Sequence, residues 1–140
     1  MSPTAGSARI APPRPELVLT AAGAVEAAIA GDGPAFVALH GGMGGYDQSW
    51  LLAAALLAEP DRHRVVALSR PGYLGTALAL GTTPDAAADL IAAVLDTLGI
   101  DRAAVAAVSA GGPTALAFAA RHPDRCRALV LVSCCTGPLA

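Results

Sequence analysis

Residues 103–113 read Ala-Ala-Val-Ala-Ala-Val-Ser-Ala-Gly-Gly-Pro, an apolar run that ends on a serine and meets a helix start at Pro113. A serine on such a sharp strand-to-helix turn is held in a strained backbone conformation, which lifts its hydroxyl clear of the sheet. The spacing fits the pattern G-x-S-x-G, with Ala107 in place of the first glycine and Gly111 as the second. The pattern predicts that Ser109 is a nucleophile. The alternative is that Ser109 is an ordinary helix N-cap.

Apolar runs and helical stretches alternate along the chain from residue 35 onward. Expected strands cover residues 35–39, 65–68, 103–108 and 128–132, and expected helices cover residues 49–58, 84–98 and 113–121. Strict alternation of strand and helix predicts a mainly parallel sheet with helices on both faces. Before it, residues 17–19 and 25–29 predict an antiparallel hairpin, which ends at the turn over residues 31–34. The expected fold class is therefore α/β.

The length and composition fit one domain. The chain has 140 residues, of which 54% are hydrophobic, and this suffices for a single core. Residues 1–14 are rich in proline, serine and alanine without periodicity, so they are expected to form a disordered tail. Residues 15–140 are expected to form the domain, through its sixth strand.

Charge and composition exclude several classes of function. The formal net charge is −2 and the nine basic residues, all arginine, form no stripe, so no nucleic-acid partner is expected. Without lysine there is no Schiff-base mechanism and no Walker loop, and neither a cofactor nor a metal site is expected. The charge-free residues 103–120 have turn residues in their middle and are a poor membrane span, so the sequence predicts a cytoplasmic protein. Three cysteines, Cys126, Cys134 and Cys135, are expected to be buried thiols, because their number is odd and two are adjacent.

A glycine-rich loop follows the first strand of the alternating region. It reads His40-Gly41-Gly42-Met43-Gly44-Gly45-Tyr46-Asp47. Acyl transfer needs at least two hydrogen-bond donors aimed at the developing oxyanion, and glycines let backbone N–H groups point inward. A dinucleotide-binding loop is a weaker alternative, because no G-x-G-x-x-G register fits residues 41–45 and Arg70, not an acid, follows the next strand.

The order of these motifs resembles α/β-hydrolases of the proline-iminopeptidase and esterase type. His40-Gly41-Gly42 follows one strand, Arg70-Pro71-Gly72-Tyr73 follows the next, and the Ser109 turn follows the third. The segment from Pro113 through His122-Pro123-Asp124-Arg125 to residues 129–132 is similar to the family's helix and following strand. The resemblance covers roughly residues 15 to 138 and is to the N-terminal half of that fold.

The resemblance implies roles for the glycine loop. The backbone N–H groups of Gly42 and Ala110 would form the oxyanion hole, with Met43 as an alternative to Gly42. His40, together with Gly41, would be a structural member of the loop and not the general base.

The turn that begins at Arg70 departs from the family pattern, in which an aspartate often stands near the position of Ser69. Proline and glycine in this turn are explained by turn geometry, which favours a scaffold role for it.

The resemblance also implies catalytic residues that these 140 residues lack. In this fold the serine is followed by an acid and then by a histidine. After Ser109 the sequence offers only His122 and Asp124, at a helix end, and His63 is expected in a solvated turn. The acid, the histidine and a cap domain are therefore expected outside this chain, as in a truncated α/β-hydrolase fold.

Two interpretations of function follow. The first is a serine hydrolase that cleaves an ester or amide bond of a small molecule through an acyl-enzyme on Ser109, with this chain inactive by itself. The second is a catalytically silent half-domain that serves as a binding or interaction module. In both cases the apolar strand over residues 128–132 has no later strand to cover it, so we expect a complementing C-terminal half or self-association through this edge. The substrate and the oligomeric state do not follow from the sequence.

Overall fold

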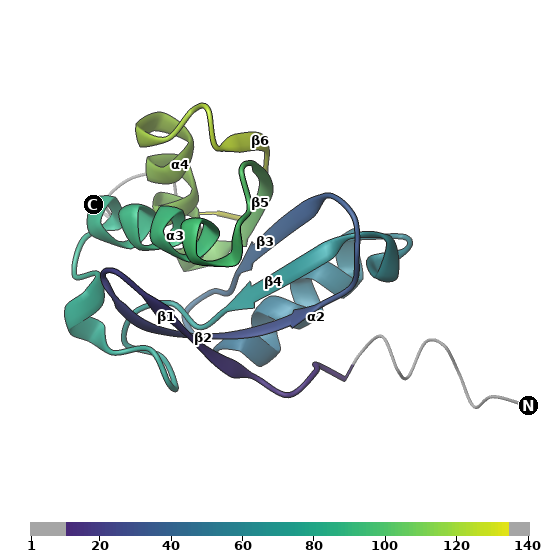
Figure 1. Cartoon of the computed structure of the whole chain (residues 1–140), viewed down its shortest axis with the longest axis horizontal. Helices are drawn as coiled ribbons and strands as arrows, with labels where there is room; N and C mark the ends of the chain where they lie inside the picture. The colour runs from purple at the N-terminus through teal and green to yellow at the C-terminus, as the bar shows by residue number, and fades with distance from the viewer. Residues whose placement is uncertain (1–10, 135–140) are drawn as a thin grey trace, which may run out of the picture.

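The structure, a computed structural model, describes residues 11–134, whose apolar runs form one six-stranded sheet (Figure 1). The strands are β1 (Glu16–Thr20), β2 (Gly23–Ala30), β3 (Ala35–Leu39), β4 (Arg64–Leu68), β5 (Ala103–Val108) and β6 (Cys126–Val132). Their order across the sheet is β1-β2-β4-β3-β5-β6. Strands β4, β3, β5 and β6 are parallel, whereas β1 pairs antiparallel with β2, and β2 with β4. The predicted mainly parallel sheet with an N-terminal antiparallel hairpin is confirmed.

Helices cover both faces of this sheet, as predicted. They are α2 (Tyr46–Leu56), α3 (Pro84–Leu98) and α4 (Gly112–Arg121), with short 3₁₀ turns over Pro60–Arg62, Leu78–Leu80 and Ser109–Gly111. Helices α3 and α4 lie side by side on one face, and α2 lies on the other (Figure 1). Two cores result: Leu95 and Phe118 belong to the one under α3 and α4, and Trp50 to the one under α2.

Local signals set the bounds of α3. The Thr83 hydroxyl accepts a hydrogen bond from the Ala86 N–H at 3.1 Å, and Pro84 occupies the first turn. At the other end Gly99 adopts a left-handed φ of 69°. The apolar stripe faces the sheet and buries Ala88, Ile91, Ala92 and Leu95. Helix α3 therefore covers the predicted residues, because the chain itself carries both of its caps.

Other bounds differ from the predicted ones because long-range bonds set them. Helix α2 begins at Tyr46, three residues early, because the Tyr46 N–H donates to Ser69 Oγ at 2.9 Å and the Gly45 carbonyl accepts from the next turn. Strand β6 begins two residues early, because Cys126 pairs with Ala103 beside a register shift. Neither partner is near in sequence, so periodicity could not supply these bounds.

Strand β6 has one neighbour among residues 11–134, which is β5. Its Val130 side chain is 37% exposed, in agreement with the open edge that the sequence predicts. The thiols of Cys126 and Cys134 are free but half-buried, not buried as predicted, because this end of the sheet is covered on fewer sides. Cys135 and residues 1–10 of the predicted tail lie outside the described part of the chain, and residues 11–14 form no helix or strand. Within residues 11–134, no helix has the length and apolar character needed to cross a membrane.

Candidate active site

Three loops meet at the carboxyl ends of β3, β4 and β5, because parallel strands present these ends at one edge of the sheet. The Arg70 N–H donates to His40 Nε2 at 2.9 Å, which joins the loops after β4 and β3. A Cβ placed on Gly41 would lie 3.3 Å from the Cβ of Ser109, so the loop after β3 also touches the turn after β5. The structure thus brings the predicted glycine loop and the predicted nucleophile together.

Ser109 has the backbone of a strained turn. Its φ is +50°, in the left-handed region that few non-glycine residues adopt. The residue is exposed, and its hydroxyl makes no hydrogen bond to any other residue in the described part of the chain. The N-cap alternative is wrong, because Ser109 opens the 3₁₀ turn Ser109–Gly111 and the N-cap of α4 is Gly111, without a side-chain bond.

The turn packs directly against the end of β3, and this explains the glycine at its third position. A Cβ on Gly111 would lie 2.8 Å from the His40 carbonyl oxygen and 3.0 Å from that of Leu39, and both are backbone atoms that cannot swing away. The alanine that replaces the first motif glycine, Ala107, is fully buried within β5. The small residues of the motif are therefore required by close approach.

Gly111→Ala should consequently lower the free energy of unfolding by about 1–3 kcal/mol, the usual cost of overpacking. Gly42→Ala is the matched control, because a Cβ there meets no heavy atom within 4 Å. Urea unfolding followed by circular dichroism measures both. An unchanged unfolding free energy in Gly111→Ala would contradict the close approach.

His40 is buried, and both nitrogens of its ring have backbone hydrogen-bond partners. Its Nε2 accepts the Arg70 N–H, so the proton is on Nδ1, which donates to the Gly41 carbonyl at 2.7 Å. Burial lowers the pKa of this imidazole below its usual value, so the neutral form is favoured. The backbone N–H of His40 donates to Ser49 Oγ at 3.0 Å, and the Ser49 hydroxyl donates to the Leu68 carbonyl at 2.7 Å. Both ring nitrogens are thus occupied by the scaffold.

The Arg70 side chain holds the glycine loop in place. Its Nε donates to the His40 carbonyl at 2.8 Å, and its Nη2 donates to the Gly41 carbonyl at 3.0 Å. The guanidinium carbon lies 5.1 Å from the centroid of the Tyr73 ring, which packs edge-on against His40 at 4.6 Å. The scaffold role predicted from proline and glycine is therefore incomplete, because the arginine side chain makes the long-range contacts. The position of an arginine between an apolar strand and a turn is the sequence signal that could have indicated this role of the Arg70 side chain.

The predicted oxyanion donors lie at the surface of this site. The Gly41 carbonyl faces Arg70, so the Gly42 N–H of the same planar peptide points the opposite way, away from Arg70. Gly42 is exposed, and Met43 is 82% exposed. Ala110 is also exposed and is the second residue of its 3₁₀ turn, where N–H groups have no acceptor within the helix. All three N–H groups remain candidates for the hole.

A carboxylate that the sequence interpretation did not use supports the same region. Ser69 Oγ donates to Glu26 Oε1 at 2.9 Å while accepting the Tyr46 N–H at 2.9 Å. The same Glu26 oxygen accepts the Gly75 N–H at 3.0 Å. Where the family often has an aspartate near position 69, this chain therefore has a serine and a glutamate from the neighbouring strand β2. Sequence alone could not pair them, because they are 43 residues apart.

The remaining histidines lie away from Ser109. His122 follows the ten-residue helix α4, which begins next to Ser109 and is about 15 Å long. Its Nε2 lies 2.8 Å from Asp89 Oδ1 on α3. His63 precedes β4, at the opposite end of the sheet, and its Nδ1 lies 3.3 Å from the Glu59 carbonyl. No histidine in residues 11–134 therefore contacts the predicted nucleophile.

The Asp89 cluster joins α3 to α4 and should make stability depend on pH. Hydrogen bonds from Arg121 and then His122 lower the pKa of the Asp89 carboxyl from 3.8 to about 2. Because the folded pKa is depressed, the stabilisation is present above about pH 4 and is lost as pH falls toward 2. The free energy of unfolding, measured with urea, should therefore fall less between pH 4 and pH 2 in Asp89→Asn than in the wild type.

The Asp89 effect should shrink in high salt, since the cluster is exposed. Asp32→Asn, which removes a carboxylate without an ion pair to any described residue, should follow the wild type. Identical pH profiles for wild type and Asp89→Asn would contradict the assignment.

Comparisons with known proteins agree with this geometry. Residues 34–138 match the model of the alpha/beta hydrolase fold family. The chain is 30% identical over 123 residues to the uncharacterized hydrolase YcgS of Bacillus subtilis, which is 88% of this chain and 42% of that protein. It is 40% identical over 77 residues to the 2-hydroxy-6-oxononadienedioate/2-hydroxy-6-oxononatrienedioate hydrolase of Burkholderia vietnamiensis, which is 54% of this chain and 27% of that protein.

Among solved structures, an alpha/beta hydrolase fold protein from Nakamurella multipartita is 45% identical, with a TM-score of 0.79. The match covers 86% of this chain and 41% of that one. The chain thus spans at most about two fifths of the length of these relatives. By its family-model match, its strand order and its relatives, the chain belongs to the α/β-hydrolase fold family.

Proposed function

We propose that Ser109 is the nucleophile of a hydrolase that cleaves an ester or amide bond through an acyl-enzyme. The observation that carries the proposal is the exposed Ser109 hydroxyl, without an intramolecular partner in residues 11–134, on a backbone with φ of +50°. Such a conformation costs about 1–3 kcal/mol and is typical of functional sites. The loop of Gly41 and Gly42 lies beside it, where an oxyanion would form.

In the proposed reaction a base takes the Ser109 proton while Oγ bonds to the carbonyl carbon and the carbonyl π electrons move onto oxygen. The N–H groups of Ala110 and Gly42, or Met43 in place of Gly42, donate to that oxygen. Collapse expels the alcohol or amine, which takes the proton from the base. Water then releases the acid from Ser109 by the same route. Because His40 is committed to the scaffold, the base in this proposal comes from a part of the whole protein outside residues 11–134.

A small-molecule substrate is part of the proposal. The relatives are hydrolases, and the one from Burkholderia vietnamiensis is named for a small organic molecule. This chain spans a minor part of those proteins, so the substrate of a relative is not assigned to it. Simple chromogenic esters test which acyl groups it accepts.

A second candidate function is a binding module without catalysis. It is favoured by one observation, which is that none of the chain's three histidines contacts Ser109. A chimera separates the two candidates: residues 1–134 of this chain replace the matching segment of the Nakamurella multipartita protein, which supplies the rest of the fold. After incubation with p-nitrophenyl acetate and an acid quench, an acetyl group on the Ser109 peptide would support the hydrolase. A folded chimera that stays unmodified and releases no p-nitrophenol would favour the binding module.

The oxyanion hole has its own test. Gly42→Pro removes the proposed N–H donor and should lower kcat of the chimera by about 10²–10³-fold with little change in KM, because the donor acts mainly in the transition state. Gly42→Ala keeps the N–H, and its Cβ meets no heavy atom within 4 Å, so its kcat should stay within a few-fold. Unchanged turnover in Gly42→Pro would contradict Gly42 as donor and favour Met43.

A further inference from the structure

An open cavity of about 330 Å³ lies beside the Ser109 turn. Ala110 and Thr114 line it from the start of α4, and Arg70, Tyr73 and Leu78 line it from the segment after β4. Its size falls in the range of small-ligand sites. A second, apolar cavity under Leu68 and Leu90 has only about 10 Å³, which is room for no more than one water. A third, of about 380 Å³, is lined by Asp96, Asp101 and Arg125, which do not belong to the loops around Ser109. The open cavity is therefore the one in which a ligand would lie beside the proposed nucleophile.

Arg70 is the one charged residue among the described residues that line the open cavity. Two of its N–H donors are used by the carbonyls of His40 and Gly41, and its side chain also interacts with Tyr73, which leaves part of its five-donor guanidinium for a ligand. It forms no ion pair with a carboxylate in the described residues. Burial lowers the pKa of this guanidinium, because the charge is partly removed from water without an anion beside it. A bound carboxylate would offset that cost.

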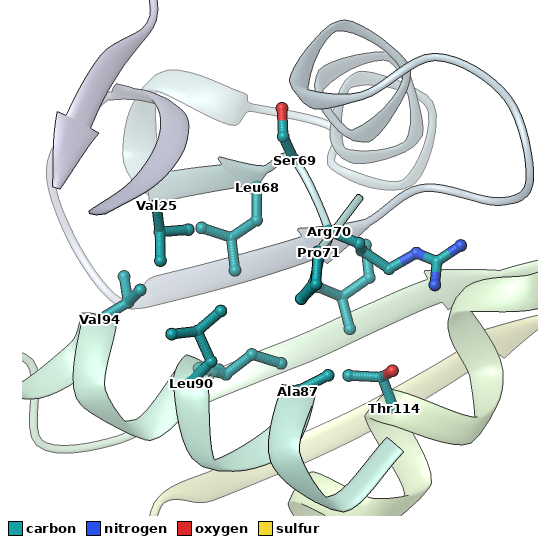
Figure 2. A pocket seen from close by; sticks show the side chains of 11 residues that line it. Val25, Leu68, Ser69, Arg70, Pro71, Ala87, Leu90, Val94 and Thr114 are labelled. Atoms are coloured by element: carbon teal, nitrogen blue, oxygen red, sulfur yellow. The ribbon is translucent and has the colours of Figure 1, made fainter. Parts of the chain in front are cut away.

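Thr114 adds a second polar group without a partner. The residue as a whole is only 5% exposed, and no hydrogen bond joins its hydroxyl to another residue within 11–134. Figure 2 shows the Arg70 side chain and the Thr114 oxygen both directed away from the apolar cavity. Thr114 lines both cavities, so its methyl group can face the apolar cavity while its hydroxyl is available to the open cavity. A hydroxyl at the wall of a cavity can donate a hydrogen bond to an acceptor on a ligand.

We propose that this cavity binds a carboxylate of the substrate, with Arg70 donating to it and Thr114 adding a hydrogen bond. The proposal rests on the proposed function and narrows its substrate to small esters or amides that carry a carboxylate a few bonds from the reactive carbonyl. Ala110 lines the same cavity, so the carboxylate site and the proposed oxyanion hole are adjacent. Tyr73 and Leu78 would contact the carbon chain between the two groups.

Binding by the full chain tests the proposal without turnover. Monomethyl glutarate and dimethyl glutarate differ by one carboxylate, and saturation-transfer NMR titrations give their affinities. The wild type should bind the monoester at least about tenfold more tightly, as a charge-assisted hydrogen bond is worth roughly 1.5–3 kcal/mol. Arg70→Gln should abolish this preference, Arg70→Lys should keep part of it, and Thr114→Val should weaken it several-fold. Arg102→Gln, which removes an exposed charge elsewhere, is the control and should change nothing.

Kinetics of the chimera separate substrate recognition from loop positioning. A purely structural role of Arg70 would lower turnover of p-nitrophenyl hydrogen glutarate and p-nitrophenyl pentanoate alike, leaving the ratio of their kcat/KM values unchanged. The proposal predicts that Arg70→Gln and Thr114→Val lower that ratio. Equal binding of the two glutarate esters by the wild type, or a preference that survives in Arg70→Gln, overturns it. If the monoester binds selectively but Ser109 never reacts, only the proposed function fails. If Ser109 reacts without selectivity, only the carboxylate site fails.

Discussion

Replacing Ser109 with alanine should lower ester hydrolysis by the chimera on the order of 10⁴-fold or more, the scale on which losing a nucleophile acts in serine hydrolases. The variant loses the atom that bonds to the carbonyl carbon, while the loop of Gly41 and Gly42 and the cavity beside it are untouched. KM should therefore change little. Initial rates with p-nitrophenyl acetate, measured from zero to saturating ester, give both constants.

Ser133→Ala is the matched control for this experiment. Ser133 is also exposed after a strand and also has a left-handed φ, +47°, but it follows β6 and not β5. Its replacement should leave turnover within about twofold, as surface substitutions usually do. Wild-type turnover in Ser109→Ala, or a comparable loss in Ser133→Ala, would contradict the assignment.

The 140-residue chain alone should hydrolyse the same ester about 10⁴-fold more slowly than the chimera. Its three histidines are His40, His63 and His122, and none of them has a hydrogen bond to Ser109, because the ring nitrogens described above bond to other groups. A serine hydroxyl without a base is a poor nucleophile near neutral pH.

The rest of the fold should also cover the exposed edge of β6, so light scattering should find the chimera monomeric and the chain alone self-associated. A monomeric chain with Ser109-dependent turnover close to that of the chimera would contradict both expectations.

The parts of the fold that sequence predicted correctly depend on local patterns. Helix α3 carries its own caps, Thr83 and Gly99, and has a single apolar face. Its bounds could therefore be predicted to the residue. The central strands β3 and β5 are apolar throughout because both of their faces are buried. The Ser109 turn could be located because its small neighbours are a steric requirement of the motif.

The parts that sequence missed depend on bonds between distant residues. Tyr46 joins α2 because Ser69, just after the end of β4, accepts its N–H. Arg70 could be placed in a turn, but its bonds to two carbonyls of the loop after β3 appear only once the strands are paired. Glu26 lies in β2, the second strand of the predicted hairpin, and its carboxylate supports the loop after β4. Periodicity predicts the elements, whereas these contacts depend on how the elements are assembled.

The central claim, that Ser109 is an activated nucleophile, is tested most directly by labelling the chimera with a fluorophosphonate probe and mapping the adduct by peptide mass spectrometry. The serine oxygen attacks phosphorus and fluoride leaves, so only an activated hydroxyl reacts at an appreciable rate. We predict one adduct, on the peptide that contains Ser109, and none in Ser109→Ala. An adduct on a different serine that persists in Ser109→Ala, or no adduct in a chimera that hydrolyses esters, would contradict the claim.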